Sequence, residues 1–94
     1  MVIGSAVYTL HIYSSQNLKD KRRIIRSIME KIRHRFHAAI AEVDKMDNYQ
    51  IAVLGLAVVS NETSHVQNIL DNITRFIENS PEEFEISNIV IELL

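Results

Sequence analysis

Apolar and polar residues alternate in the first segment of the chain and then change to a helical spacing. Residues 2–13 are rich in β-branched and aromatic side chains, which predicts a strand whose alternate positions face opposite sides. In Leu18–Phe36 the apolar positions fall on one sector of a helix. Asn17 or Ser15 can cap the start of this helix, and Asp20 lies in its first turn.

The same order of patterns returns in the second half of the chain. Residues 37–44 alternate and predict a short strand, and residues 50–59 form the most apolar run, which predicts a central strand buried on both faces. Start signals at 60–62 and stop signals at 79–81 bound a second helix. Residues 84–94 predict a last strand, whose acidic lead-in contains Glu82, Glu83 and Glu85.

This element order is strand, helix, strand, strand, helix, strand. Two split βαβ units predict an α+β ferredoxin-like fold, βαββαβ, in which two helices cover one face of a four-stranded antiparallel sheet. With 94 residues, we expect a single ferredoxin-like domain over residues 1–94.

The predicted sheet has one face without helices, yet the 50–59 strand is apolar on both sides. Such a patch in water indicates a contact surface. We therefore expect a homodimer that buries the open sheet face. An apolar row is expected on each face, one with Ile51, Val53, Ala57 and Val59, the other with Ala52, Leu54, Leu56 and Val58.

Charge is distributed very unevenly along the chain. Eight of its ten Lys and Arg residues lie between Lys19 and Arg35 with two acids, a formal +6, although the whole chain carries −2. A basic helical sector of this kind fits the phosphates of RNA, and it equally fits a solvated face paired with neighbouring acids. The candidate nucleic-acid-binding residues are Lys19, Arg22, Arg23, Arg26 and Arg33.

Two other bases of this segment, Lys21 and Arg35, lie at the edge of the apolar sector. Their long side chains can extend along the sheet rim to water, which is the favoured interpretation, or form buried ion pairs. We expect Glu42 and Asp44 to be structural partners of helix bases such as Lys21, Arg22 or Arg35.

The chain contains no dedicated chemical motif. It has no cysteine, its four histidines lack metal-ligand spacing, and Glu42, Asp44 and Asp47 lack the glycine and ligand density of a calcium loop. We expect no metal, no cofactor and no catalytic residue; an enzyme built on these three acids and His65 is the weakest alternative. The absence of a signal-peptide pattern and of a long apolar run predicts a cytoplasmic protein without a membrane segment.

Several short motifs, in order along the chain, resemble those of the YlxP-like family of small bacterial domains of unknown function. Leu18-Lys19-Asp20-Lys21-Arg22-Arg23 is similar to that family's Ser-Leu-Lys-Glu-Lys-Arg signature. Asp47-Asn48-Tyr49-Gln50 is similar to its Asp-Leu-Trp-Gln, with Tyr in place of Trp. The other matching elements are Arg35-Phe36, Ala41-Glu42-Val43-Asp44, Val58-Val59-Ser60-Asn61 and His65.

The resemblance implies a ferredoxin-like fold and no established activity. In many bacteria such genes lie beside those for a translation initiation factor and a ribosome-binding factor, which implies work on the ribosome or RNA. Our leading hypothesis is a non-enzymatic, dimeric binding domain that engages ribosomal or other structured RNA through its first helix. The alternative is a structural or regulatory interaction module that binds a protein or a small ligand on the sheet face.

Overall fold

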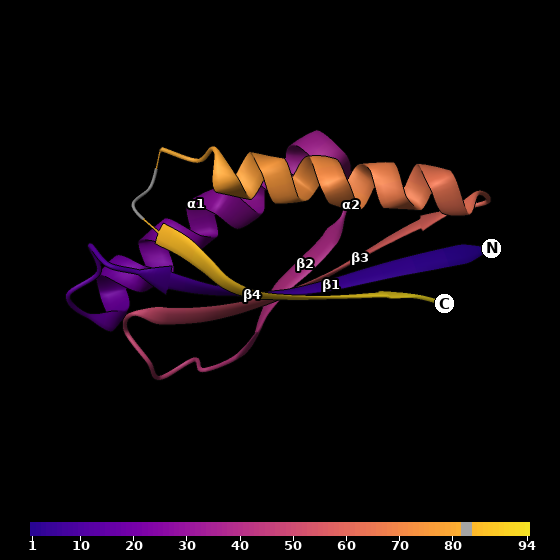
Figure 1. Ribbon diagram of the computed structural model, residues 1–94. Helices are drawn as coiled ribbons and strands as arrows, with labels where there is room; N and C mark the ends of the chain where they lie inside the picture. The colour runs from indigo at the N-terminus through magenta and orange to yellow at the C-terminus, as the bar shows by residue number, and fades with distance from the viewer. Residues whose placement is uncertain (82–83) are drawn as a thin grey trace.

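A computed structural model describes residues 1–81 and 84–94 of the chain, and the acidic residues Glu82 and Glu83 lie outside the described part. It has the predicted order of elements (Figure 1). The elements are β1 (Val2–Ile12), α1 (Leu18–Phe36), β2 (Ala39–Asp44), β3 (Ile51–Ser60), α2 (Thr63–Glu78) and β4 (Phe84–Leu93).

The four strands form one sheet in the order β2-β3-β1-β4, with antiparallel neighbours throughout. Both helices lie on the same side of this sheet, and the chain termini lie side by side at one end (Figure 1). The predicted ferredoxin-like fold is confirmed. Because β1 and β3 are the inner strands, β2 and β4 form the two edges.

The hydrophobic core lies between the sheet and the helix layer. The inward residues of β1 and β3, including Tyr8, Leu10 and Leu54, are fully buried against the apolar sectors of both helices. Gly4 of β1 faces α2, where a Cβ atom would collide with Val66. The glycine therefore lets α2 approach the strand closely.

Two details differ from the sequence-based prediction. β2 starts at Ala39, two residues later than predicted, because His37 adopts a left-handed conformation (φ 54°) and its N–H bonds the Arg33 carbonyl to end α1. The expectation that the third strand is buried on both faces is wrong for its C-terminal end. Val59 is 59% exposed because no helix covers that face.

Within the described residues, neither helix combines the length and the apolar composition that a membrane crossing requires.

Candidate nucleic-acid interface

The basic residues are carried by α1, whose N-terminus is fixed by two hydrogen bonds from backbone N–H groups to side chains. Asn17 Oδ1 accepts from the Asp20 N–H at 2.9 Å, and Asp20 Oδ2 accepts from the Gln16 N–H at 3.2 Å. The first of these bonds satisfies an N–H group that the first helical turn leaves without an intrahelical partner, and the second ties the residue before the N-cap to that turn. The helix that presents the bases therefore begins at a defined residue, as the Asn17 signal predicts.

Four of the five predicted RNA-binding residues form one exposed surface, which we call the basic face. It consists of Lys19, Arg22, Arg23 and Arg26 and surrounds a shallow hollow of about 770 Å³ that Asp20 also lines. The only ion pair within this group joins Arg23 and Asp20 at 4.0 Å. An exposed pair at this distance neutralises little charge, so most of the positive charge of the basic face remains available.

The fifth predicted residue, Arg33, lies farther along α1. Its guanidinium donates a hydrogen bond of 2.8 Å to the Ile40 carbonyl on β2. Arg33 therefore ties the C-terminal half of α1 to the sheet edge and does not line the hollow of the basic face.

Lys21 takes a different position from its neighbours in sequence. Its side chain is fully buried, and Nζ lies 2.8 Å from Glu42 Oε2. Nζ also donates to the carbonyl oxygens of Lys45 at 2.7 Å and Asn48 at 2.6 Å. Two of the three N–H donors of the ammonium thus bond main-chain carbonyls, and the Glu42 carboxylate balances its charge as an ion pair. Lys21 therefore anchors the loop between β2 and β3 to α1, and the rim position that we favoured for it is wrong.

The loop that holds Lys21 is itself ordered by local hydrogen bonds. Lys45 adopts a left-handed backbone conformation (φ 57°), and its carbonyl also accepts from the Asn48 N–H at 3.0 Å. The Asn48 side chain accepts from the N–H groups of Gln50 and Ile51, both at 2.9 Å. These bonds direct two carbonyl groups toward the ammonium, which is the arrangement that a buried cation needs.

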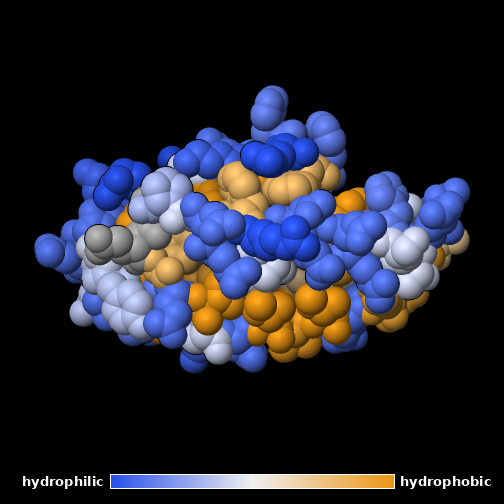
Figure 2. All heavy atoms as spheres, turned by 45° about the horizontal axis from the view of Figure 1, so that its top comes forward, coloured by the Kyte–Doolittle hydropathy of each residue, from blue (hydrophilic) through white to orange (hydrophobic). Residues whose placement is uncertain are grey.

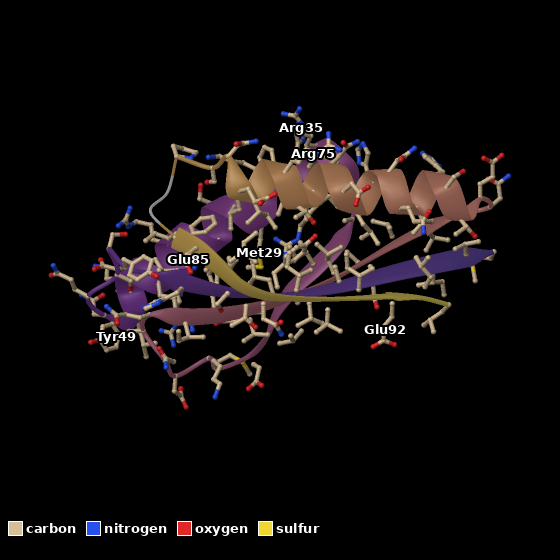
Figure 3. All side chains as sticks on the ribbon, in the orientation of Figure 1. Met29, Arg35, Tyr49, Arg75, Glu85 and Glu92 are labelled. Carbon is tan, nitrogen blue, oxygen red and sulfur yellow. The ribbon has the colours of Figure 1, made fainter. Side chains whose placement is uncertain are left out.

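The expected ion pairs of Arg35 and Asp44 are absent from the described residues. Arg35 instead lies over the rings of Phe36 and Phe76, at 5.7 and 5.4 Å from their centroids. Asp44 Oδ1 accepts from the Lys45 N–H. The physical reason is position, because Arg35 lies at the C-terminal end of α1 near Arg75 (Figure 3), whereas Asp44 precedes Lys45, which contacts Lys21 in the first turns of α1.

The acids of the enzyme alternative do not meet His65. Asp47 belongs to the loop before β3, whereas His65 Nδ1 lies 2.9 Å from the hydroxyl of Ser60, at the end of β3. The ten-residue strand between them spans roughly 30 Å at 3.4 Å per residue. Among the described residues, no three His, Asp or Glu side chains are grouped so that they could hold a metal ion.

The open face of the sheet, without helices, is apolar but lined by small residues near its centre. Ser5, Val7, Ala39, Ala41, Gly55 and Ala57 surround a wide hollow of about 430 Å³. Val43 packs over Gly55, where a Cβ atom would lie 3.0 Å from its methyl group. Burial of this face in a homodimer stays a prediction.

Sequence reasoning missed the residues that complete the Lys21 site. The Lys45 and Asn48 carbonyls are main-chain groups, which carry no sequence signature, and they lie 24 and 27 residues from Lys21. The asparagine itself was a usable signal, since Asn in a turn often bonds the backbone that follows it.

Comparison with known proteins places this ferredoxin-like domain in a family. Residues 3–91 match the family model described as "Protein of unknown function (DUF503)". The chain is also 30% identical over 81 residues to the uncharacterized protein YlxP of Bacillus subtilis, a match that covers 86% of this chain and 88% of that protein. The chain belongs to the DUF503 family.

Two designed proteins share the fold at low sequence identity. The de novo designed protein Foldit4 is 14% identical with a TM-score of 0.53, over 100% of this chain and 97% of that one. A de novo designed protein with ferredoxin fold is 13% identical with a TM-score of 0.54, over 100% of this chain and 83% of that one. These similarities support the fold alone.

Proposed function

We propose that this chain is a non-enzymatic, dimeric RNA-binding domain whose basic face engages structured RNA, such as that of the ribosome. The observation that carries the proposal is the concentration of Lys19, Arg22, Arg23 and Arg26 on one exposed surface, in a chain of net charge −2. Within the described part of the chain, this surface has a single weak acidic contact. Charge gathered in this way favours a polyanion on one side of the molecule and repels it from the others.

Arginine supplies three of these four bases, and its planar guanidinium can donate two parallel hydrogen bonds to a phosphate. The residues of the basic face include no aromatic side chain on which a base could stack, so recognition should depend on the shape and charge of the RNA backbone. The gene neighbourhood that the YlxP-like resemblance implies supports the ribosome as the source of that RNA.

The test is the salt dependence of binding to a hairpin RNA, measured by fluorescence anisotropy. If the four bases each neutralise one phosphate, log affinity should fall with log salt at a slope of roughly −3 to −4. Replacing Arg22 and Arg26 with Glu should make the salt dependence flatter, with a slope no steeper than about −2, and should weaken binding at low salt by at least 10-fold.

A matched control separates position from net charge. Lys31→Glu combined with Arg75→Glu changes the total charge by the same amount at two exposed residues outside the basic face. We expect this control to bind RNA within about threefold of the unmodified protein, since long-range charge effects are screened in physiological salt. Equal losses in both double variants, or no RNA binding at low salt, would show that the basic face is only a solvated surface.

A further inference from the structure

β4 forms one edge of the sheet, and its second half exposes large apolar side chains. Ile89, Val90, Ile91 and Leu93 are 38%, 45%, 47% and 39% exposed. Figure 2 shows the resulting hydrophobic patch below the hydrophilic side chains of α2, where β4 runs in Figure 1. A contiguous apolar patch of this kind in a small protein indicates an interaction surface.

The backbone of this edge is also available for pairing. Ile3 and Leu94 exchange two hydrogen bonds, of 3.0 and 2.8 Å, at the end of the β1–β4 ladder. In an antiparallel ladder such pairs alternate, so even-numbered residues of β4 direct their N–H and C=O groups toward β1. Ile89, Ile91 and Leu93 therefore direct theirs to the free edge, on the same residues that expose apolar side chains.

Edge strands usually carry features that prevent pairing, such as Lys, Pro or a local bulge. From Ile86 to the end of β4 there is no Lys, Arg or Pro, and Glu92 is the only charged residue. The irregularity in the β1–β4 register lies at Ser87 of β4, between Ile86 and Asn88, and the pairing with β1 is regular from Asn88 to Leu93. The segment after Ser87 therefore has no Lys, Pro or bulge of its own that would prevent pairing.

We infer that β4 binds β4 of a second copy of this chain in an antiparallel pair, with the two-fold axis at Val90. This inference rests on the dimer of the proposed function and moves its contact from the open sheet face to the sheet edge. In this register Ile89 lies opposite Ile91 of the second copy, and Ser87 lies opposite Leu93. Ile89 and Ile91 have outward backbone groups, so their two pairs are hydrogen-bonded ones, whereas Ser87 lies at the shift in the β1–β4 register.

The residue opposite Glu92 distinguishes this register from the two registers whose axis is shifted by one residue. The Glu92 side chain points away from the helix layer (Figure 3) and would lie opposite the neutral Asn88 of the second copy. A shift of the axis to Ile89 would place Glu92 opposite Ile86, and a shift to Ile91 would place it opposite Val90. Of these three registers, only the one centred on Val90 gives the Glu92 carboxylate a polar neighbour, and it keeps Ile89 opposite Ile91.

A second copy fits this edge better than an unrelated peptide because the strand is complementary to itself. The two-fold axis makes each contact twice, so an exposed apolar edge receives an identical one. The contact consists mainly of one strand pair, which is at the small end of the interface scale, below about 1,200 Å². We therefore expect a dimer that dissociates on dilution.

The dimer would form an eight-stranded sheet with all four helices on one side. The α1 helices contact β2, the strand farthest from the new junction. The two β2 strands would be separated by seven strand spacings, about 34 Å at 4.8 Å each. Both basic faces would thus lie on the helix side of one assembly, far enough apart to bind separate segments of a long RNA.

The inference is tested by sedimentation velocity from 1 to 300 μM with variants of the two apolar surfaces. Ile91→Glu introduces two carboxylates at the pair and should raise the dimer dissociation constant on the order of 100-fold or more. Val59→Glu is the matched control on the open sheet face, and we expect its dimer to be unchanged. If Ile91→Glu melts less cooperatively by circular dichroism, Ile89→Lys replaces it.

Three results would overturn the inference. These are a wild-type monomer at 300 μM, a dimer lost in Val59→Glu but kept in Ile91→Glu, or a monomer whose β4 resonances shift only with an added apolar peptide. The proposed RNA function is judged separately. Monomeric Ile91→Glu should bind a short hairpin with unchanged affinity, whereas a dimer that binds no hairpin contradicts the RNA function and leaves the edge pairing intact.

Discussion

The buried ammonium of Lys21 gives the sharpest prediction for stability. Lys21→Met keeps the length of the side chain and removes its charge and its three donors. The Asn48 carbonyl then has no partner among its described contacts, whereas the Lys45 carbonyl keeps the Asn48 N–H. The Glu42 Oε2 atom is buried and loses the cation that it contacts.

The magnitude follows from these three contacts. Truncating one partner of a buried ion pair costs about 3–5 kcal/mol, and a hydrogen bond to a charged group contributes about 1.5–3 kcal/mol. The Glu42 side chain is 17% exposed, so its carboxylate can turn partly toward water and recover some of the loss. We expect Lys21→Met to reduce the free energy of unfolding by about 3–5 kcal/mol, a large part of the 5–15 kcal/mol typical of a domain.

The assay is urea denaturation followed by far-ultraviolet circular dichroism, with the slope of the transition checked for a two-state change. Arg22→Met is the control, because this neighbouring base is exposed and should change stability by about 0.5 kcal/mol or less. Lys21→Met/Glu42→Met removes both charges and should recover part of the loss, leaving the cost of the Asn48 carbonyl. A Lys21→Met protein within about 1 kcal/mol of wild type would refute the anchoring role.

Two further predictions concern the core. Burial raises the pKa of Tyr8 above its ordinary 10.0, and the charges of Asp71 and Glu78 raise it further. The folded protein thus keeps the phenol proton to higher pH than the unfolded chain. The contribution of the neutral Tyr8 phenol to the free energy of unfolding is therefore complete below pH 10 and is lost as pH rises beyond it. Tyr8→Phe loses the 2.7 Å bond to Thr74, about 1 kcal/mol in urea denaturation at pH 8, and should show a smaller decline above pH 10. Gly4→Ala should cost about 1–3 kcal/mol by thermal melting because its Cβ collides with Val66 in the core, whereas Gly55→Ala meets only the half-exposed Val43 and should cost less; equal costs would contradict this packing.

The extent to which sequence determined these conclusions differs between α1 and the strands beside it. The bounds of α1 could be predicted, since Asn17 caps its start and its apolar sector ends at Phe36. The start of β2 could not, because His37 ends the helix in a conformation that usually requires glycine. The apolar sequence of β4 indicates a buried strand and gives no sign that its side chains are exposed. Their exposure follows from the position of β4 at the edge of the sheet, which is set by the strand order.

The candidate interface shows the same limit at the level of single residues. Periodicity separates the bases of α1 into sectors and groups Arg22 and Arg26 with the other residues of the basic face. It also places Lys21 beside the apolar sector, but whether such a lysine reaches water or is buried depends on groups supplied by a distant loop. Local patterns contain no record of those groups, so the burial of Lys21 could be recognised only from the tertiary structure.

The buried pair and the basic face have opposite relations to solvent, although adjacent residues of one helix form them. Glu42 contacts Lys21 inside the molecule and is not available to neutralise the bases outside, where Asp20 is the one acid in contact among residues 1–81 and 84–94. Salt screens exposed charges strongly and buried pairs weakly. The contacts that fix the loop should therefore persist at salt concentrations that remove a bound polyanion. If the proposed function holds, α1 should release RNA as ionic strength rises while the fold that positions its bases remains intact.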